Sequence, residues 1–446
     1  MDAVNSPRQF LEQLYVSCIA ALQPGGTVTH ALDTIATKAS LAGSLHVLAI
    51  GKAATAMTLA TEAWCADRGV AIAGGLAVAQ ADTEPFSAGI RLLVGDHPTP
   101  GHSSQMAAAE LGRYVDAHIH AGDRVLVLLS GGASAVIGAP RDGIDPTEFV
   151  ACFAALLGAG LTIDEMNSVR RRLSRWGGGR LGAALLRRGA RVVVLVVSDV
   201  IGDNLAAIGS GPCAPDWSGE AQIDTILVRA HVSTEMRDRI RANLAVAFAA
   251  DASAARADVT TIPHHIISNN SRALDIITHL ARETGAVAVT GAESLQGDAD
   301  ACGSMVAREL LSLRAESSRR TQPVIVCWGG EPTVTLPEHD PPRGGRMQAL
   351  ALSAARSLHI AGDAAQGITI LAAGTDGRDG TTDAAGAVVD DKTWRAISAD
   401  GRDPARDLAG LRSHDALRLV RALLPAFVSG TNVNDVVIGM IDASVD

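Results

Sequence analysis

The amino-acid sequence predicts an α/β protein with two domains: a doubly wound N-terminal domain and a smaller C-terminal α/β domain. Short runs of Val, Leu and Ile alternate with helical patterns, which is typical of a mostly parallel sheet covered by helices on both faces. The chain has 446 residues, which is too long for one ordinary hydrophobic core and suits two domains. Its 47% hydrophobic and 19% charged residues are typical of a compact protein.

The first domain is expected over residues 1–255. Apolar runs predict its buried strands at 45–50, 75–79, 124–129 and 191–197. Helical patterns cover 52–67 and 103–119 between these strands. Residues 216–259 are more polar and helical, and their Ala- and Asp-rich end is the expected connector to the second domain.

The second domain is expected over residues 256–446, as another α/β unit. Apolar runs predict its strands at 264–268, 286–290, 323–328, 368–373 and 435–440. A further strand-like stretch, "TVTL", stands at 333–336.

The composition limits the classes of partner. With 38 basic and 48 acidic residues the net charge is −10, and aromatics are only 3%, which argues against nucleic acid but allows a local basic pocket for a small anion. The N-terminus is acidic and amphipathic, and no run reaches 18 apolar residues, so we expect no signal peptide, no membrane span and a cytoplasmic location. The six cysteines form no C-x-x-C pair and are expected to be reduced packing residues.

Two glycine turns follow strands of the first domain, where ligands collect in open α/β sheets. The turn "GKAATAM" places Lys52 in the first turn of a helix, beside amide groups that favour anions. The turn "SGGASA" offers amides and hydroxyls to a phosphate or carboxylate. Its candidate residues are Ser130, Gly131, Gly132 and Ser134. A solvated lysine and a plain tight turn explain the two stretches equally well.

A pair of aspartates follows the strand at 191–197. Asp199 and Asp203 stand four residues apart, ahead of a Gly-Ser-Gly-Pro turn. Because Mg²⁺ takes one or two carboxylates together with phosphate oxygens, the pair is a candidate magnesium site. An N-cap aspartate and a surface aspartate are the equally good alternative.

The charged candidates of the second domain lie in two loops. The stretch "WGGEPTVTLPEHDPPRGGRMQALAL" holds Glu331 and delivers Arg346, a side chain suited to bidentate contacts with phosphate or carboxylate. The stretch "AAGTDGRDGTTDAAGAVVD" holds Asp376 among glycines, but it lacks the register and the closing Glu of a calcium loop.

The stretch "RRRLSRWGGGRLG" matches G-x-G-x-x-G from Gly177 to Gly182. A dinucleotide-binding turn follows an apolar strand, whereas a helical, arginine-rich segment precedes this one and the apolar strand comes after it, so we predict no dinucleotide-binding turn here. The Walker A, protein-kinase, H-E-x-x-H and G-x-S-x-G motifs do not occur. His97, beside two prolines, is expected to be a turn residue or a ligand contact.

Taken together, these stretches resemble the class II glycerate kinases, or glycerate 2-kinases, whose C-terminal half is the MOFRL domain, here at about 323–440. The resemblance covers essentially the whole chain in order. It rests on "GKAATAM", "DHPTP", "LLSGGASA", "NSVRRRLSRWGGGRLG", "SDVIGDNLAAIGSGPCAPD", "GGEPTV", "RGGRMQALAL", "GTDGRDGTTDAAGAVVD" and "GTNVND".

The resemblance implies a Rossmann-like N-terminal domain, a smaller C-terminal domain and an active site in the cleft between them. It implies transfer of the γ-phosphate of ATP to the 2-hydroxyl of D-glycerate with Mg²⁺, by an enzyme that could be a homodimer. The family's important lysine matches Lys52 and its arginine matches Arg346. Asp199 would hold Mg²⁺ or accept the hydroxyl proton. The remaining candidates for binding substrate or phosphate are Ser130, Gly131, Gly132, Ser134, Arg180, Asp203, Glu331 and Asp376.

The chain departs from the family pattern at several positions, which we expect to lie near the site. The resemblance implies that the glycine run is a turn between two helices. Gly177 stands there where relatives carry lysine, and Arg170, Arg175 or Arg180 could replace that charge. The other departures are Gly101, Ala133, Trp328, Met347 and Ala349. Glycerate is therefore the default substrate, and another small hydroxy-acid or sugar acid, a hydroxypyruvate reductase activity, or a non-catalytic acid-binding protein are the alternatives.

Overall fold

The computed structural model describes residues 6–36, 44–81, 86–87, 89–161, 163–216, 220–242, 258–316, 321–335 and 343–443. By the contacts between its residues the chain divides into two compact units. The N-terminal unit is Pro24–Ile267, and the C-terminal unit combines Met1–Gln23 with Ser268–Asp446.

The sheet of the N-terminal unit has the strand order β3-β2-β1-β4-β5-β6. Its strands are β1 (Leu45–Ile50), β2 (Ile72–Ala79), β3 (Ile90–Val94), β4 (Arg124–Ser130), β5 (Arg191–Val197) and β6 (His264–Ser268). The pairs β2–β3, β1–β2, β1–β4 and β4–β5 are parallel. This is the classic doubly wound order, in which the direction of winding reverses between β1 and β4. The predicted doubly wound sheet is confirmed.

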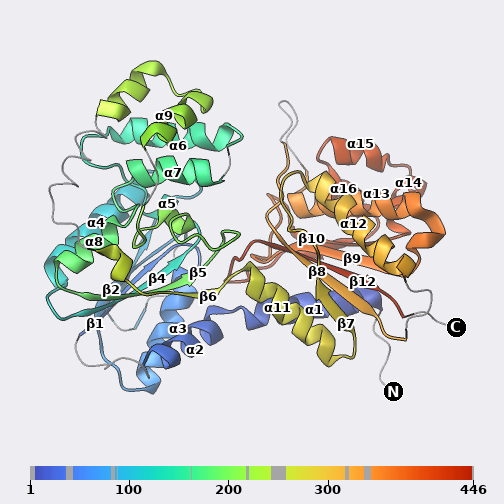
Figure 1. Cartoon of the computed structure of the whole chain (residues 1–446), viewed down its shortest axis with the longest axis horizontal. Coiled ribbons are helices and arrows are strands. Elements are labelled where there is room, and N and C mark those ends of the chain that lie inside the picture. The colour runs from blue at the N-terminus through green and yellow to red at the C-terminus, as the bar shows by residue number, and fades with distance from the viewer. Residues whose placement is uncertain are drawn as a thin grey trace. The chain divides into compact units, whose positions relative to one another are not determined.

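Helices cover both faces of this sheet (Figure 1). They are α2 (Pro24–Ala36), α3 (Ala54–Asp67), α4 (His102–His118), α5 (Ala133–Val136), α6 (Pro146–Gly158), α7 (Ile163–Leu173), α8 (Arg180–Arg187) and α9 (Glu220–Arg229), with short 3-10 helices η1 (Ile208–Ser210) and η2 (Val259–Thr261). Alternate strand residues such as Leu48 and Val127 pack in one core with α4 and α8, while α3 contacts β1, β2 and β4. Helices α6, α7 and α9 share a second core around Phe149 and Phe153.

The sheet of the C-terminal unit has the order β11-β10-β9-β12-β8-β7. Its strands are β7 (Val287–Thr290), β8 (Val324–Gly330), β9 (Ile368–Gly374), β10 (Ala384–Asp390), β11 (Leu423–Pro425) and β12 (Asp435–Ile441). Among its strand pairs β7–β8 is parallel, whereas β8–β12, β12–β9, β9–β10 and β10–β11 are antiparallel. The sheet is therefore mixed, with the last strand in its interior.

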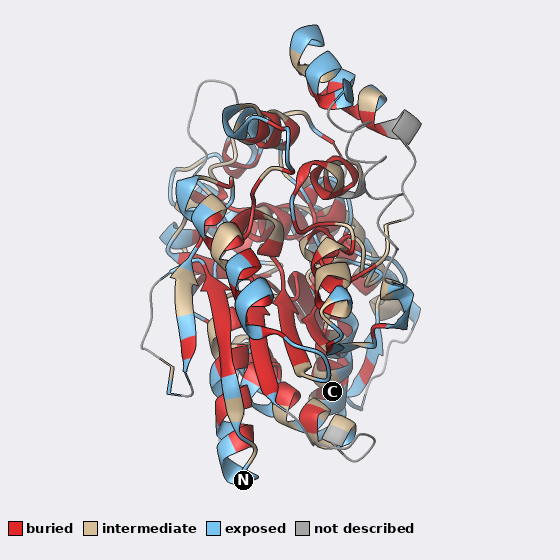
Figure 2. Cartoon of the chain, turned by 90° about the vertical axis from the view of Figure 1, so that its left-hand side faces the viewer, coloured by how far each residue is buried: buried red, intermediate tan, exposed pale blue. Residues whose placement is uncertain are grey.

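Two layers of helices cover this second sheet (Figure 1). They are α1 (Pro7–Ala21), α11 (Asn270–Glu283), α12 (Ala299–Glu316), α13 (Arg346–Ala361), α14 (Thr393–Ala399), α15 (Pro404–Ala409) and α16 (Ser413–Leu419), with the 3-10 helix η3 (Gly362–Ala365). Helix α13 packs on β9 and β10, and α1 and α11 pack on β12. Strands β8, β9 and β12 are buried along nearly their whole length. Figure 2 colours each residue by its burial, and the strands that face the viewer there are red along most of their length.

Two segments lie in a different unit from the one predicted. The first helix, α1, contacts α11, β9 and β12 of the C-terminal unit, because its apolar side chains, among them Leu11 and Leu14, are buried there. Strand β6, which we assigned to the second domain, extends the first sheet beside β5, where Val194 N donates to Pro263 O at 3.0 Å. The predicted connector ending at residue 259 lies largely outside the described residues, which resume at 258.

Smaller differences concern individual elements. Strands β3, β10 and β11 were not predicted. Strands β3 and β11 are short, and β10 is rich in alanine, which weakens the apolar signal. In "TVTL", Thr333 forms one isolated bridge with Asp298, and Leu336 lies outside the described residues. The predicted helices at 52–67 and 103–119 are confirmed as α3 and α4. All six cysteines are buried and free, as expected.

We expect Gly303→Val to destabilise the C-terminal unit. A Cβ at Gly303 of α12 would overlap Leu350 O of α13 and lie 2.8 Å from Ser353 Cβ, so the two helices would have to move apart. Overpacking of this kind costs about 1–3 kcal/mol of unfolding free energy. Thermal or denaturant unfolding should show the loss, whereas Gly158→Ala, at an open position near the end of α6, should be neutral or slightly stabilising.

Candidate functional site

The loops after β1 and β4 interlock at the point where the winding of the first sheet reverses. Lys52 N donates to Gly131 O at 2.9 Å, and Ala53 N donates to Ser130 Oγ at 3.0 Å. Gly51 has φ +121°, and a Cβ there would overlap both Ser130 oxygens. Only glycine therefore allows the two loops to approach this closely.

A third and a fourth loop converge on the same two glycines. The carboxylate of Asp199, after β5, lies so close to Gly131 that a Cβ on Gly131 would overlap it. A Cβ on Gly132, which has φ +80°, would lie 3.2 Å from Lys52 Cγ and 3.3 Å from His97 Nε2. The predicted residues Lys52, Gly131, Gly132 and Asp199 thus lie together, and His97 joins them from the loop after β3.

The pKa of His97 reflects the burial and the charges of this cluster. Burial first, and then the positive charges of Lys52 and Arg170, together lower the pKa of its ring to about 4. The imidazole is therefore neutral near pH 7, and the surrounding potential is positive. Positive charge beside glycine amides suits an anionic ligand.

Other predicted residues of this unit stand around the cluster with local roles. Asp203 adopts φ +56°, and its N–H donates to Val200 O at 3.0 Å. Ser134 lies in α5, directly after the glycine turn. Arg180 donates from Nη2 to Ser174 O at 2.6 Å and from Nε to Arg175 O at 3.1 Å, so its guanidinium binds the carbonyls that follow α7. In the structure Arg180 therefore stabilises the C-terminal end of α7.

The glycine run lies between α7 and α8, as predicted, and no strand precedes it. Gly178 and Gly179 have φ +57° and +80°, conformations that side chains other than glycine rarely adopt. A Cβ at Gly177 would lie 3.1 Å from Arg171 Cα and 3.3 Å from Ser210 O. A lysine at position 177 would therefore require the backbone around it to shift by a few tenths of an ångström.

In the C-terminal unit the predicted Arg346 is held by two carboxylates. It begins α13, and its Nε and Nη2 lie 2.5 and 3.3 Å from Asp435 Oδ2 and Oδ1. Its Nη1 lies 3.2 Å from Glu331 Oε1. These acids raise the pKa of Arg346 against the effect of burial, so the guanidinium stays charged. Burial in turn raises the pKa of Asp435 to about 7, although Arg346 opposes this shift.

Surrounding polar groups fix this ion pair in place. Asp379 accepts hydrogen bonds from Met347 N at 3.1 Å and Gln348 N at 2.8 Å, which orients the first turn of α13. Asn434 Nδ2 donates to Glu331 Oε2 at 2.9 Å. Asn270 Nδ2 donates to Asp435 O at 3.0 Å, so it holds the backbone at the start of β12.

Asp435 was not among the predicted site residues, whereas Asp376 was. Because β12 is antiparallel to β8 and β9, its first residue lies opposite their last residues, Gly330 and Gly374. A search for polar residues at strand ends therefore overlooks it, although the polar turn before β12 was a signal. Asp376 lies at the same edge of the sheet, where it accepts from Arg378 N at 3.0 Å.

Three of the departures from the family pattern are core residues rather than site residues. Trp328, Met347 and Ala349 belong to the hydrophobic core of the C-terminal unit. Trp328 Nε1 donates to Glu309 Oε2 at 2.9 Å, so even its polar atom is satisfied inside the fold. The side chains of these three residues therefore point into the core, although Met347 directly follows Arg346 in α13.

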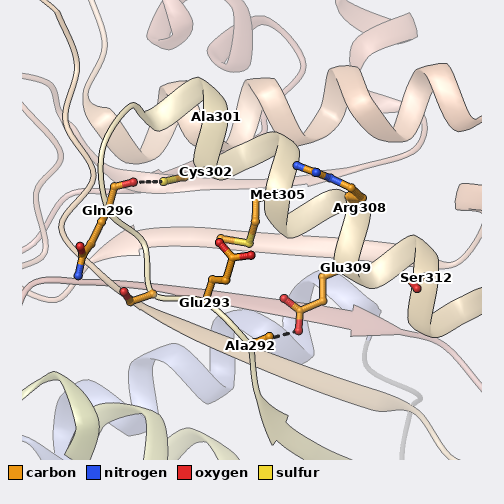
Figure 3. A pocket seen from close by; sticks show the side chains of 10 residues that line it. Ala292, Glu293, Gln296, Ala301, Cys302, Met305, Arg308, Glu309 and Ser312 are labelled. Atoms are coloured by element: carbon orange, nitrogen blue, oxygen red, sulfur yellow. Dashed lines mark hydrogen bonds between the residues drawn. The ribbon is translucent and has the colours of Figure 1, made fainter.

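A separate pocket of about 530 Å³ lies beside α12 in the C-terminal unit (Figure 3). Glu309, which lines it, also accepts a hydrogen bond from Ala292 N at 3.1 Å and thereby ties the loop after β7 to the helix. Neither Arg346 nor Asp435 lines this pocket. We therefore assign it no part in the candidate site.

Two family models match the chain, one over most of the N-terminal unit and one within the C-terminal unit. A family model described as a domain of unknown function (DUF4147) matches residues 10–245, and the MOFRL family model matches residues 324–435. The chain is 34% identical to the D-glycerate 2-kinase of Thermotoga maritima over 77% of this chain and 78% of that protein. It is 31% identical to a protein of Agrobacterium vitis named "Putative hydroxypyruvate reductase", over 97% and 94% of the two chains.

A solved structure is similar over nearly the whole length. The crystal structure of a glycerate kinase from Thermotoga maritima superposes with a TM-score of 0.82 at 31% identity, covering 98% of this chain and 99% of that one. The chain therefore belongs to the glycerate 2-kinase family, with a DUF4147 domain followed by a MOFRL domain. Among the described helices, none is long and apolar enough to cross a membrane.

We expect the ring of His97 to report the charge of Lys52. In the wild type the ring should titrate near pH 4, as burial and the positive charges dictate. Lys52→Met should raise this pKa, because one of those charges is removed, although burial should keep it below the ordinary value of about 6.5. Histidine NMR titration measures both, and Lys392→Met, in the other unit, should leave the His97 signal unchanged.

Proposed function

We propose that this protein transfers the γ-phosphoryl group of ATP to the 2-hydroxyl of D-glycerate. The observation that carries the proposal is the convergence of Lys52, Asp199 and the Gly131–Gly132 turn at the switch point of the first sheet. Phosphoryl transfer needs positioning and positive charge rather than covalent catalysis, and this cluster supplies both. Relatives named as glycerate 2-kinases support the choice of acceptor.

Each residue of the cluster has a role that its position suits. The exposed ammonium of Lys52 neutralises the transferred phosphoryl group, while its backbone anchors the glycine turn. The amides of residues 131–134, with the hydroxyl of Ser134, bind phosphate oxygens. Within the C-terminal unit, Arg346 is a positive charge that Asp435 and Glu331 orient and that suits a phosphate or carboxylate.

We also propose that Asp199 holds Mg²⁺. Among the described residues, no three His, Cys, Asp or Glu side chains lie close enough together to form a complete metal site. Mg²⁺ in phosphoryl-transfer enzymes needs only one or two protein carboxylates, because phosphate oxygens and water complete its shell, so a single aspartate fits. The ion would neutralise charge on the phosphate oxygens.

A reductase acting on hydroxypyruvate is the second candidate, because two relatives from Agrobacterium vitis carry that name. Such an enzyme needs a nucleotide-binding glycine turn after a strand. Here the G-x-G-x-x-G match begins between α7 and α8, and the turn after β1 carries Lys52 instead. The site geometry therefore favours the kinase.

The kinase proposal is tested by ADP release from Mg-ATP with D-glycerate and with a panel of other small hydroxy-acids. NADH and NADPH oxidation with hydroxypyruvate is followed in parallel. We expect ADP release with D-glycerate and no nicotinamide oxidation. Lys52→Ala should lower kcat by about 10²–10³-fold or more while leaving the unfolding temperature unchanged, because the side chain is exposed and its charge acts on the transition state. Wild-type protein that releases ADP with none of the acids would refute the proposal.

The pH profile should show a limb due to Asp435. Its pKa of about 7 means that the carboxylate gains a proton as the pH falls below 7 and then attracts Arg346 less. We expect kcat/KM to fall on the acid side of pH 7 in the wild type. In Asp435→Asn, whose activity should already be reduced, this acid limb should disappear. An unchanged limb would show that another group causes it.

A further inference from the structure

Arg170 is a buried cation whose hydrogen-bonding groups are not used. Its residue is only 8% exposed, and its Nε and Nη2 atoms are enclosed without a hydrogen-bond partner. Within the part of the chain that the structure describes, no carboxylate forms an ion pair with it. Its guanidinium carbon lies 5.1 Å from the ring centroid of Phe153, which satisfies the face of the group but not its N–H donors.

The neighbouring arginines form ion pairs, hydrogen bonds or ring contacts that occupy their guanidinium groups. Arg171 Nε and Arg172 Nε lie 3.3 and 3.1 Å from the two carboxylate oxygens of Asp216. Arg180 donates to carbonyls beyond α7, and the exposed Arg175 stacks 5.4 Å from the centre of Trp176. Of the candidates to replace the lysine missing at position 177, Arg170 alone combines burial with unsatisfied donors.

The position of Arg170 ties it to the cluster at the switch point. Helix α7 packs on the segment that follows β5, where Asn167 Nδ2 donates to Ala207 O at 3.1 Å and Arg171 Nη1 donates to Ala206 O at 2.9 Å. Arg170 stands between these two anchors. Its charge acts on His97 together with that of Lys52, so the three side chains share one electrostatic environment.

A buried guanidinium without an acid is unfavourable in the absence of a ligand. Burial lowers the pKa of Arg170, yet an arginine stays protonated in proteins, so the cost remains in the folded state. Evolved sites retain such a cost where a ligand relieves it. The missing partner is therefore an anion.

We propose that Arg170 binds the carboxylate of the hydroxy-acid substrate, an inference that rests on the proposed kinase function. The two unsatisfied atoms, Nε and Nη2, form one edge of the guanidinium, and two parallel N–H groups on one edge match the two oxygens of a carboxylate. The exposed Lys52 and the Gly131–Gly132 turn remain for the phosphates of ATP. A small acid also reaches a buried arginine more readily than a triphosphate does.

The test compares Arg170→Met and Arg170→Lys with the wild type, and Arg187→Met on the exposed surface of α8 is the matched control. In Arg170→Met we expect KM for D-glycerate to rise by about 100-fold, while KM for ATP changes less than about twofold. The preference for glycerate over its neutral amide should fall by a similar factor. Arg170→Lys should recover part of the loss, and Arg187→Met should match the wild type.

Stability separates binding from a structural role. Without ligand, Arg170→Met should unfold at a temperature about 2–4 °C above that of the wild type, because an unpaired buried charge is replaced by an apolar chain of similar length. A lower unfolding temperature with an unchanged preference for glycerate over its amide would overturn the proposal. A rise in KM for ATP alone would overturn it as well, because Arg170 would then bind phosphate.

Failure of the kinase function can be recognised separately. If the wild type releases no ADP with any acid, binding is measured by the thermal shift that D-glycerate produces, with its amide as the neutral control. A shift in the wild type that is lost in Arg170→Met supports the carboxylate site even without turnover. An equal shift in both proteins refutes it.

Discussion

The candidate site depends on the close approach of two loops where the first sheet reverses its winding. Gly51 and Gly131 leave space for Ser130 and for the carboxylate of Asp199, and any side chain at either glycine would separate them. Backbone hydrogen bonds from Lys52 and Ala53 lock the loops together. The lysine is therefore positioned by main chain, which varies less in conformation than long side chains do.

In the C-terminal unit, side chains rather than main chain position the charged residue. Arg346 is oriented by Asp435 and Glu331, and those acids are held in turn by Asn270 and Asn434. The arrangement places a charged group at an exact position, at the cost of a buried carboxylate whose pKa is close to neutral. Its state of ionisation is consequently sensitive to pH where that of most aspartates is not.

The sequence was sufficient to predict the doubly wound sheet, because its central strands are continuous apolar runs followed by glycine turns. It also singled out Lys52 and Asp199, which lie together at the Gly131–Gly132 turn because each follows a strand of the first sheet. Their roles and that of Arg346 stay predictions. Asp435 escaped because it begins an antiparallel strand, and Arg170 could not be chosen among three arginines because only the fold shows which of them is buried. Trp328 was misjudged since a departure from a family pattern does not reveal which way a side chain points.

The mixed order of the second sheet has a consequence for biosynthesis. Helix α1, at residues 7–21, packs against β12, at residues 435–441, and β12 lies between β8 and β9 in the sheet. During synthesis α1 therefore leaves the ribosome long before β12 is made. The apolar face of α1 can pack fully only after β12 has joined the sheet. The described strands of the first sheet all lie between residues 45 and 268, so this sheet can form before the second half of the chain is made. The C-terminal unit can close only after residues 435–441 have been synthesised.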